Sequence, residues 1–270
     1  MDGCNHPDDL DPVELESSVQ SRESGLHTDA EIVMDSATVP TWKSLLLKFV
    51  VAEFAMVPAA LFLIWAFNLP NASSIGRQLF GTRHGIWGLL IGLIATVPLI
   101  LSIVMTERIR WKPFQELHEL VMTKLAPLFR GMPWWGLLLI ATGAGFGEEW
   151  LFRGFGISMV SDLLPSAWSP DLVQWTAIGL TALIFGALHA MTRMYFILTL
   201  GMGVYLGLMV VVTESLIPAV VCHGLYDFLA LLYIMRLDRL RQCCLVSSEA
   251  DDDITKNTPT DTVSVGVLDH

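Results

Sequence analysis

The chain has 270 residues, of which 53% are hydrophobic and only 16% are charged, and its mean hydropathy is +0.55. This composition excludes an ordinary soluble domain, and the recurrence of apolar runs excludes a single membrane anchor. The net charge of -11 at pH 7 comes from the two ends, because residues 1–40 contain ten acidic side chains and one Arg and residues 245–270 contain six acidic side chains and one Lys. We therefore expect disordered acidic tails at residues 1–40 and 242–270, a membrane-embedded domain at residues 41–241, and no nucleic-acid partner.

Six apolar segments are long enough to cross a bilayer, which takes about 20 helical residues. In chain order they span residues 42–67, 85–105, 133–164, 172–190, 194–212 and 216–235. The sequence therefore predicts an all-α integral membrane protein with about six transmembrane helices in contact with membrane lipids. The number rises to seven if the third segment breaks at Gly143–Gly147, but we expect one long helix from about 133 to 163.

Residues 107–132 mix apolar and charged side chains at helical spacing, which is typical of an amphipathic helix at the membrane surface. With the N-terminus inside, nearly all Lys and Arg residues near the apolar segments fall on the cytoplasmic side, and the opposite side contains only Arg77 and Arg83. This distribution predicts a multi-pass protein, in the cell inner membrane, with both termini cytoplasmic.

Ionisable side chains inside apolar segments are informative because each costs about 2.5–3.5 kcal/mol to insert into the membrane. The third segment contains Glu148, Glu149 and Arg153. Glu149 and Arg153 are four residues apart, so they share a helix face and can pair. Glu148 lies about 100° around the helix and needs a partner from another helix. Taken alone, the two carboxylates could equally well have no catalytic role and merely support packing or line a water-filled cavity.

Two further segments carry a histidine four residues from another side chain. Phe185 and His189 share a face of the fourth segment, and His223 and Asp227 share a face of the sixth. A single intramembrane His is more often a packing residue, and a His–Asp pair can simply stabilise a helix interface. Six ionisable groups on three helices are too costly, however, unless they converge on one polar interior. Two carboxylates and two imidazoles in one pocket are suited to activating a water molecule.

The motifs occur in a fixed order on three predicted membrane helices. They are EExxxR (Glu148, Glu149, Arg153), FxxxH (Phe185, His189) and HxxxN/D (His223, Asp227). In this order the chain resembles the CPBP family of intramembrane proteases, which includes the CaaX prenyl endopeptidases and bacterial bacteriocin-processing and immunity proteins. The resemblance covers roughly residues 133–236. It implies an intramembrane endopeptidase that cleaves a membrane-associated substrate, for example a prenylated peptide or protein.

The resemblance also implies roles for individual residues. Glu148 would be the general base for a water molecule shared with His189, and Glu149 and Arg153 would form an orienting pair. Glu148, His189 and His223 would also suit a catalytic zinc ion with an open position for water. A metal-free glutamate mechanism fits the same residues, so the sequence leaves the cofactor open.

Asp227 departs from the family pattern, which often has Asn at this position. His223 and Asp227 would lie at the oxyanion side of the scissile carbonyl. An ionised Asp would repel an oxyanion, so Asp227 must be protonated or must serve by orienting His223.

Two other classes of function stay open. The departure at Asp227 favours a non-proteolytic membrane scaffold or an immunity-type protein, and buried charges also occur in ion or proton transporters. The absence of an evident inverted repeat argues against a transporter. Glu53, in the first apolar segment, is interpreted as a structural residue and not as a catalytic one.

Overall fold

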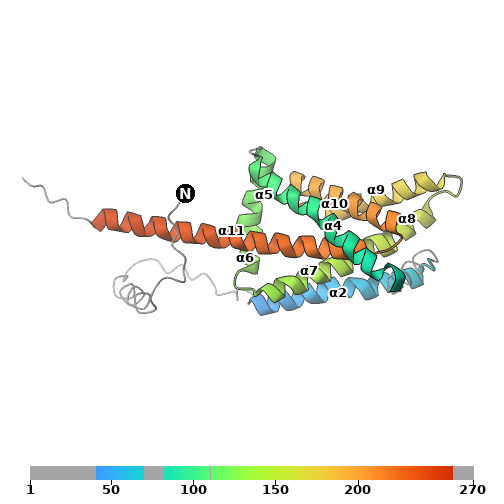
Figure 1. Ribbon diagram of the computed structural model, residues 1–270, viewed down its shortest axis with the longest axis horizontal. Helices are drawn as coiled ribbons and strands as arrows, with labels where there is room; N and C mark the ends of the chain where they lie inside the picture. The colour runs from blue at the N-terminus through green and yellow to red at the C-terminus, as the bar shows by residue number, and fades with distance from the viewer. Residues whose placement is uncertain (1–40, 70–81, 110, 258–270) are drawn as a thin grey trace, which may run out of the picture. The chain divides into compact units, whose positions relative to one another are not determined.

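A computed structural model of the chain describes residues 41–69, 82–109 and 111–257. All regular secondary structure in these ranges is helical, and no strand occurs in them (Figure 1). The predicted all-α membrane fold is therefore confirmed. The expected tail at residues 1–40 lies outside the described part of the chain.

Five of the described helices are long and apolar enough to span a membrane. They are α2 (Trp42–Ala66), α4 (Thr82–Arg108), α9 (Pro170–Leu188), α10 (Arg193–Thr213) and α11 (Ile217–Asn257). Hydroxyl side chains cap three of them: Thr41 Oγ1, Ser169 Oγ and Thr192 Oγ1 accept hydrogen bonds from the amides of Ser44, Leu172 and Tyr195, respectively. Such caps satisfy N–H groups that the first turn leaves unpaired. The protein is thus a multi-pass integral membrane protein.

The third predicted segment, residues 133–164, is one helical stretch built from three pieces. These are α7 (Trp134–Glu149), the π-helix η3 (Trp150–Gly156) and α8 (Ile157–Leu163). The expected helix from about 133 to 163 is present, without a break at Gly143–Gly147. The change to π geometry begins immediately after Glu149, and single π-helical turns are frequent at functional sites.

The segment predicted to be an amphipathic helix, residues 107–132, begins with the end of α4 and continues as three short helical pieces. These are α5 (Lys112–Leu120), the π-helix η2 (Val121–Leu125) and α6 (Ala126–Phe129). Gly131, with φ of 73°, reverses the chain between α6 and α7. This left-handed conformation costs a glycine little because glycine has no Cβ.

The last helix continues beyond its predicted membrane segment. It reaches Asn257, whereas the sequence predicts a disordered tail from residue 242 onward. The helical conformation of residues 242–257 differs from that prediction, and residues 258–270 lie outside the described part of the chain. Extending an existing helix requires no new nucleus, so even acidic residues can remain helical at its end.

The chain divides into two compact units. One is Pro40–Arg236, which contains the first half of α11, and the other includes Leu237–His270. In the described part of the second unit, Gln242 Nε2 donates a hydrogen bond to Asp238 Oδ2 at 2.8 Å. All six predicted site residues belong to Pro40–Arg236.

Side-chain exposure in Pro40–Arg236 is the reverse of that in a soluble protein. Trp65 and Val212 are 76% and 80% exposed, whereas Glu149 and Arg153 are 0% and 1% exposed. Apolar side chains therefore face outward, where lipid is the solvent, and these charged side chains lie inside.

Glycines on opposite faces of α7 allow two other helices to approach it closely. A Cβ at Gly145 would lie 2.6 Å from the Gly224 nitrogen of α11, and a Cβ at Gly143 would lie 3.0 Å from Glu53 Cβ of α2. A Cβ at Gly147 would overlap the Glu53 carbonyl oxygen. The contact between α2 and α7 is also visible as two adjacent ribbons in Figure 1. Small residues of this kind let membrane helices pack backbone to backbone.

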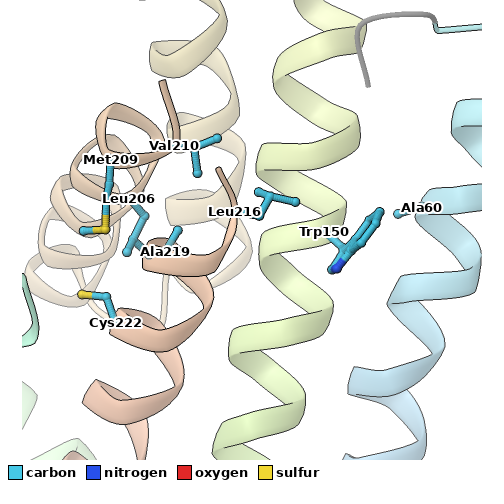
Figure 2. Packing of buried hydrophobic residues seen from close by; sticks show 8 residues of the cluster. All are labelled: Ala60, Trp150, Leu206, Met209, Val210, Leu216, Ala219 and Cys222. Atoms are coloured by element: carbon cyan, nitrogen blue, oxygen red, sulfur yellow. The ribbon is translucent and has the colours of Figure 1, made fainter. Parts of the chain in front are cut away.

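A buried apolar cluster joins η3 to the helices around it (Figure 2). Trp150 extends from η3 toward Ala60 of α2, while Leu206 of α10 and Ala219 of α11 lie on the other side of η3. Because Trp150 directly follows Glu149, this packing fixes the helix where the charged side chains begin.

Replacing Gly145 should test the close approach of α7 and α11. Gly145→Ala should lower the free energy of unfolding by about 1–3 kcal/mol, because the atoms it meets are backbone atoms that cannot rotate away. Thermal unfolding of the purified protein in detergent micelles measures the change. Gly201→Ala is the matched control: it lies in α10 with no atom within 4 Å of an added Cβ, so it should leave the melting temperature unchanged or higher. Equal melting temperatures for the two variants would contradict the packing described here.

Candidate active site

Six predicted residues come from four helical elements and meet in one region. Glu148 and Glu149 end α7, and Arg153 follows in η3. His189 is the C-cap of α9, and His223 and Asp227 lie one turn apart on α11. These side chains form a connected set of short contacts, as the expected convergence on one polar interior requires.

Glu149 connects the three most buried of these side chains, which are Glu149 itself, Arg153 and His223. Its Oε1 accepts a hydrogen bond from Arg153 Nη1 at 2.7 Å and lies 2.8 Å from His223 Nδ1. Arg153 Nη2 donates to the Gly203 carbonyl of α10 at 3.2 Å. One carboxylate therefore connects α7, η3 and α11, and its arginine partner extends the connection to α10.

Phe185 packs the two histidines and the arginine together. The Arg153 guanidinium lies 4.7 Å from the centre of the Phe185 ring, an arrangement that a cation and an aromatic face favour. The ring centres of His189 and His223 lie 4.5 and 6.0 Å from that of Phe185. The phenylalanine of the FxxxH motif thus has a structural contact with all three side chains.

Glu148 faces both imidazoles at a greater distance. Its Oε1 lies 3.8 Å from His189 Nε2, and its Oε2 lies 3.9 Å from His223 Nε2. These distances are too long for direct hydrogen bonds but suit one bridging water molecule. Glu148 Oε2 is buried and has no hydrogen-bond partner within the described residues, which leaves it available to such a water.

The hydrogen-bond partners define which ring nitrogens carry protons. His189 Nδ1 lies 2.8 Å from the Phe185 carbonyl oxygen, which can only accept, so Nδ1 donates and Nε2 faces Glu148. His223 Nδ1 donates to the Glu149 carboxylate, and His223 Nε2 lies 3.4 Å from Asp227 Oδ2. His223 therefore has carboxylate oxygens at both ring nitrogens.

One side of the set is more accessible than the other. The side chains of His189 and Asp227 are 29% and 31% exposed, compared with 4% for His223 and 0% for Glu149. A substrate would therefore approach from the side of His189 and Asp227.

Glu148, His189 and His223 are the residues that the sequence suggests for a zinc ion. Ligand atoms about 2.0–2.2 Å from a tetrahedral zinc lie roughly 3.3–3.5 Å apart, whereas the oxygen–nitrogen distances here are 3.8 and 3.9 Å. Within the described ranges, no group of three or more His, Cys, Asp or Glu side chains is arranged to hold a metal ion. The side chains as placed fit a bridging water better than a zinc ion.

Two polar side chains near this set were not predicted as site residues. The Glu53 carboxyl of α2 lies within electrostatic range of Glu148, His223 and Asp227. The Tyr195 ring of α10 lies 6.4 Å from the His189 ring, and its hydroxyl lies within electrostatic range of Glu148 and Asp227. Glu53 had a sequence signal, since it is the only acidic residue between 42 and 67; Tyr195 had none.

Replacing Arg153 should reveal the strength of the buried pair. Arg153→Met should destabilise the protein by about 3–5 kcal/mol, because it leaves the Glu149 carboxylate buried without its cation. Adding Glu149→Gln should restore part of this loss, since the amide oxygen can still accept from His223 Nδ1. Thermal unfolding in detergent micelles compares the single and double variants. A double variant less stable than Arg153→Met would contradict an ion pair at this position.

Comparison with known proteins gives one family match. Residues 130–229 match a model described as Rce1-like, type II CAAX prenyl endopeptidase. No curated protein and no solved structure matches the chain. The matched region is less than half of the chain, but it contains all six predicted site residues. Residues 130–229 are therefore similar to the Rce1-like CAAX prenyl endopeptidases, the kind of family that the three motifs predict.

Proposed function

We propose that this protein hydrolyses a peptide bond near the C-terminus of a prenylated or otherwise membrane-associated protein, with a water molecule activated by Glu148. One observation carries the proposal: the Glu148 carboxylate lies a single water's reach from Nε2 of both His189 and His223. The match of residues 130–229 to CAAX prenyl endopeptidases supports the same reaction class.

The water molecule lies between Glu148 and His189. Both groups are acceptors toward it, because His189 Nδ1 already donates to the Phe185 carbonyl and its Nε2 carries a lone pair. One O–H of the water points at the carboxylate and the other at the imidazole. The oxygen lone pairs are then free to attack a carbonyl carbon, which is the geometry that general base catalysis requires.

The hydrolysis proceeds in two steps. Glu148 takes a proton from the water as its oxygen bonds to the carbonyl carbon, and the carbonyl π electrons move to oxygen to give an oxyanion. The oxyanion then collapses, the C–N bond breaks, and the proton held by Glu148 passes to the leaving amine nitrogen. A carboxyl terminus and a free amine result.

His223 stabilises the oxyanion electrostatically, through the positive charge of its ring. A ring with carboxylates at both nitrogens donates to both only as an imidazolium, and a buried cation near a developing negative charge is a strong electrostatic stabiliser. Asp227 then acts by orienting His223, at 3.4 Å, and does not itself contact the oxyanion. Glu149 and Arg153 hold the other side of the ring.

The site opens toward the cytoplasm in this proposal. His189 lies at the C-terminal end of α9, and the short connection to α10 carries Arg193. We place this connection and both chain termini on the cytoplasmic side, because Lys and Arg concentrate there, and the protein in the cell inner membrane. Prenylated proteins attach to a membrane through their modified C-termini, so such a C-terminus would reach the site from the bilayer surface.

Replacing Glu148 should abolish proteolysis. Glu148→Gln keeps the size of the side chain but removes the base, so cleavage of a farnesylated peptide ending in a CaaX sequence should fall by at least about 100-fold. Release of the C-terminal tripeptide in proteoliposomes, followed by mass spectrometry, measures the rate. Glu119→Gln, which changes an exposed carboxylate of α5, should retain the wild-type rate. Undiminished cleavage by Glu148→Gln would exclude the proposed mechanism, and an inactive wild type would favour a non-proteolytic scaffold.

Replacing Asp227 should separate its two suggested roles. Asp227→Asn should retain most of the activity, because the amide oxygen can still accept from His223 Nε2. Asp227→Leu should reduce the rate on the order of tenfold, since the ring then loses an orienting hydrogen bond worth about 1.5–3 kcal/mol. The same peptide assay compares the two variants. Full activity of Asp227→Leu would show that His223 needs no partner at this position.

A further inference from the structure

Glu53 is a half-buried acid, with one buried carboxyl oxygen, on a helix outside the matched residues. It lies on α2, in an apolar stretch where an ionisable side chain costs about 2.5–3.5 kcal/mol to insert. The sequence alone suggests a structural role for it. A structural role, however, requires a contact that compensates the cost of burial.

No such contact is present on one of its two carboxyl oxygens. Glu53 Oε2 is buried and has no hydrogen-bond partner among the residues that the structure describes. A leucine or methionine at this position would fill similar space without leaving a polar atom unpaired. Packing alone therefore gives no reason for a carboxylate here.

The backbone around Glu53 is held tightly against the active-site helix. Gly143 faces its Cβ, and Gly147 faces its carbonyl oxygen so closely that no side chain would fit between them. Gly147 directly precedes Glu148. This contact fixes the Glu53 side chain at the edge of the region that contains the catalytic carboxylate.

The charged groups within electrostatic range of Glu53 belong to that same region. On α7 the interacting group is Glu148, and on α11 the groups are His223 and Asp227. Glu53 and Glu148 each have a buried Oε2 without a hydrogen-bond partner among the described residues. This is the pattern expected if the two carboxyl groups face one water-containing space. Buried water bridges polar groups that have no direct partner.

We propose that Glu53 is a positioning residue of the active site, whose carboxyl group closes the polar pocket on the α2 side and orients Glu148 and His223 through water. The inference rests on the proposed proteolytic function. It extends the functional unit beyond residues 130–229 to the first described membrane helix. Glu53 does not contact the reacting atoms but acts through the groups that do.

Three replacements on α2 test this role with the farnesylated peptide in proteoliposomes. Glu53→Leu should lower kcat about 10- to 100-fold and leave KM nearly unchanged, because misplaced catalytic groups slow the reaction without removing substrate contacts. Glu53→Gln, which keeps the hydrogen-bonding capacity, should restore at least half of the wild-type kcat. The control, Lys48→Leu, replaces an exposed charge on the same helix by leucine and should have the wild-type kcat.

Stability measured in parallel separates positioning from folding. Glu53→Leu should melt at the wild-type temperature or above, since it removes an unpaired buried oxygen. A wild-type kcat in Glu53→Leu would overturn the inference. If Glu148→Gln is inactive in the same assay, the proposed function is retained. A lower melting temperature together with equal losses in Glu53→Leu and Glu53→Gln would also overturn it. No cleavage by the wild type would instead remove the proposed function, and the inference with it.

Discussion

The Glu149 carboxylate is the interaction on which the arrangement of the site depends. It is fully buried, accepts hydrogen bonds from Arg153 and His223 on the same oxygen atom, and so joins two segments more than 70 residues apart in the chain. A buried charge with one partner removed is strongly destabilising, so each of the three side chains depends on the other two. The pair between Glu149 and Arg153 also leaves Glu148, on the neighbouring face, as the carboxylate without a cation partner.

Backbone contact between α7 and its neighbours makes this convergence possible. Gly145 meets Gly224 on α11, the residue directly after His223, and Gly147 meets Glu53 on α2. A side chain at either glycine would separate the helices and lengthen the distances between carboxylates and imidazoles. In lipid there is little hydrophobic gain from bringing helices together, so close packing and buried polar contacts have to supply the stabilisation. The same two features that hold the bundle together also bring the site residues into contact.

Much of the fold follows from local pattern, and the deviations have physical causes. Predicted segments such as 42–67 and 194–212 end within one residue of α2 (Trp42–Ala66) and α10 (Arg193–Thr213), because hydropathy and length are sufficient to define a crossing. The length of α11 and the π geometry of η3 were not predicted. A helix can extend into polar sequence once it exists, and a π turn depends on how Trp150 and Arg153 pack against other helices, which no short-range pattern encodes.

The sequence by itself determined the pairs within each helix: Glu149 with Arg153, Phe185 with His189, and His223 with Asp227, because a spacing of four residues places two side chains on one face. Only the tertiary structure decided which faces meet. It brings His223 to Glu149, holds both imidazoles about one water from Glu148, and adds Glu53 from a helix without a recognisable motif. Such contacts depend on the rotation, depth and separation of whole helices, which glycines and packing across the bundle set, and the periodicity of one segment carries no information on them.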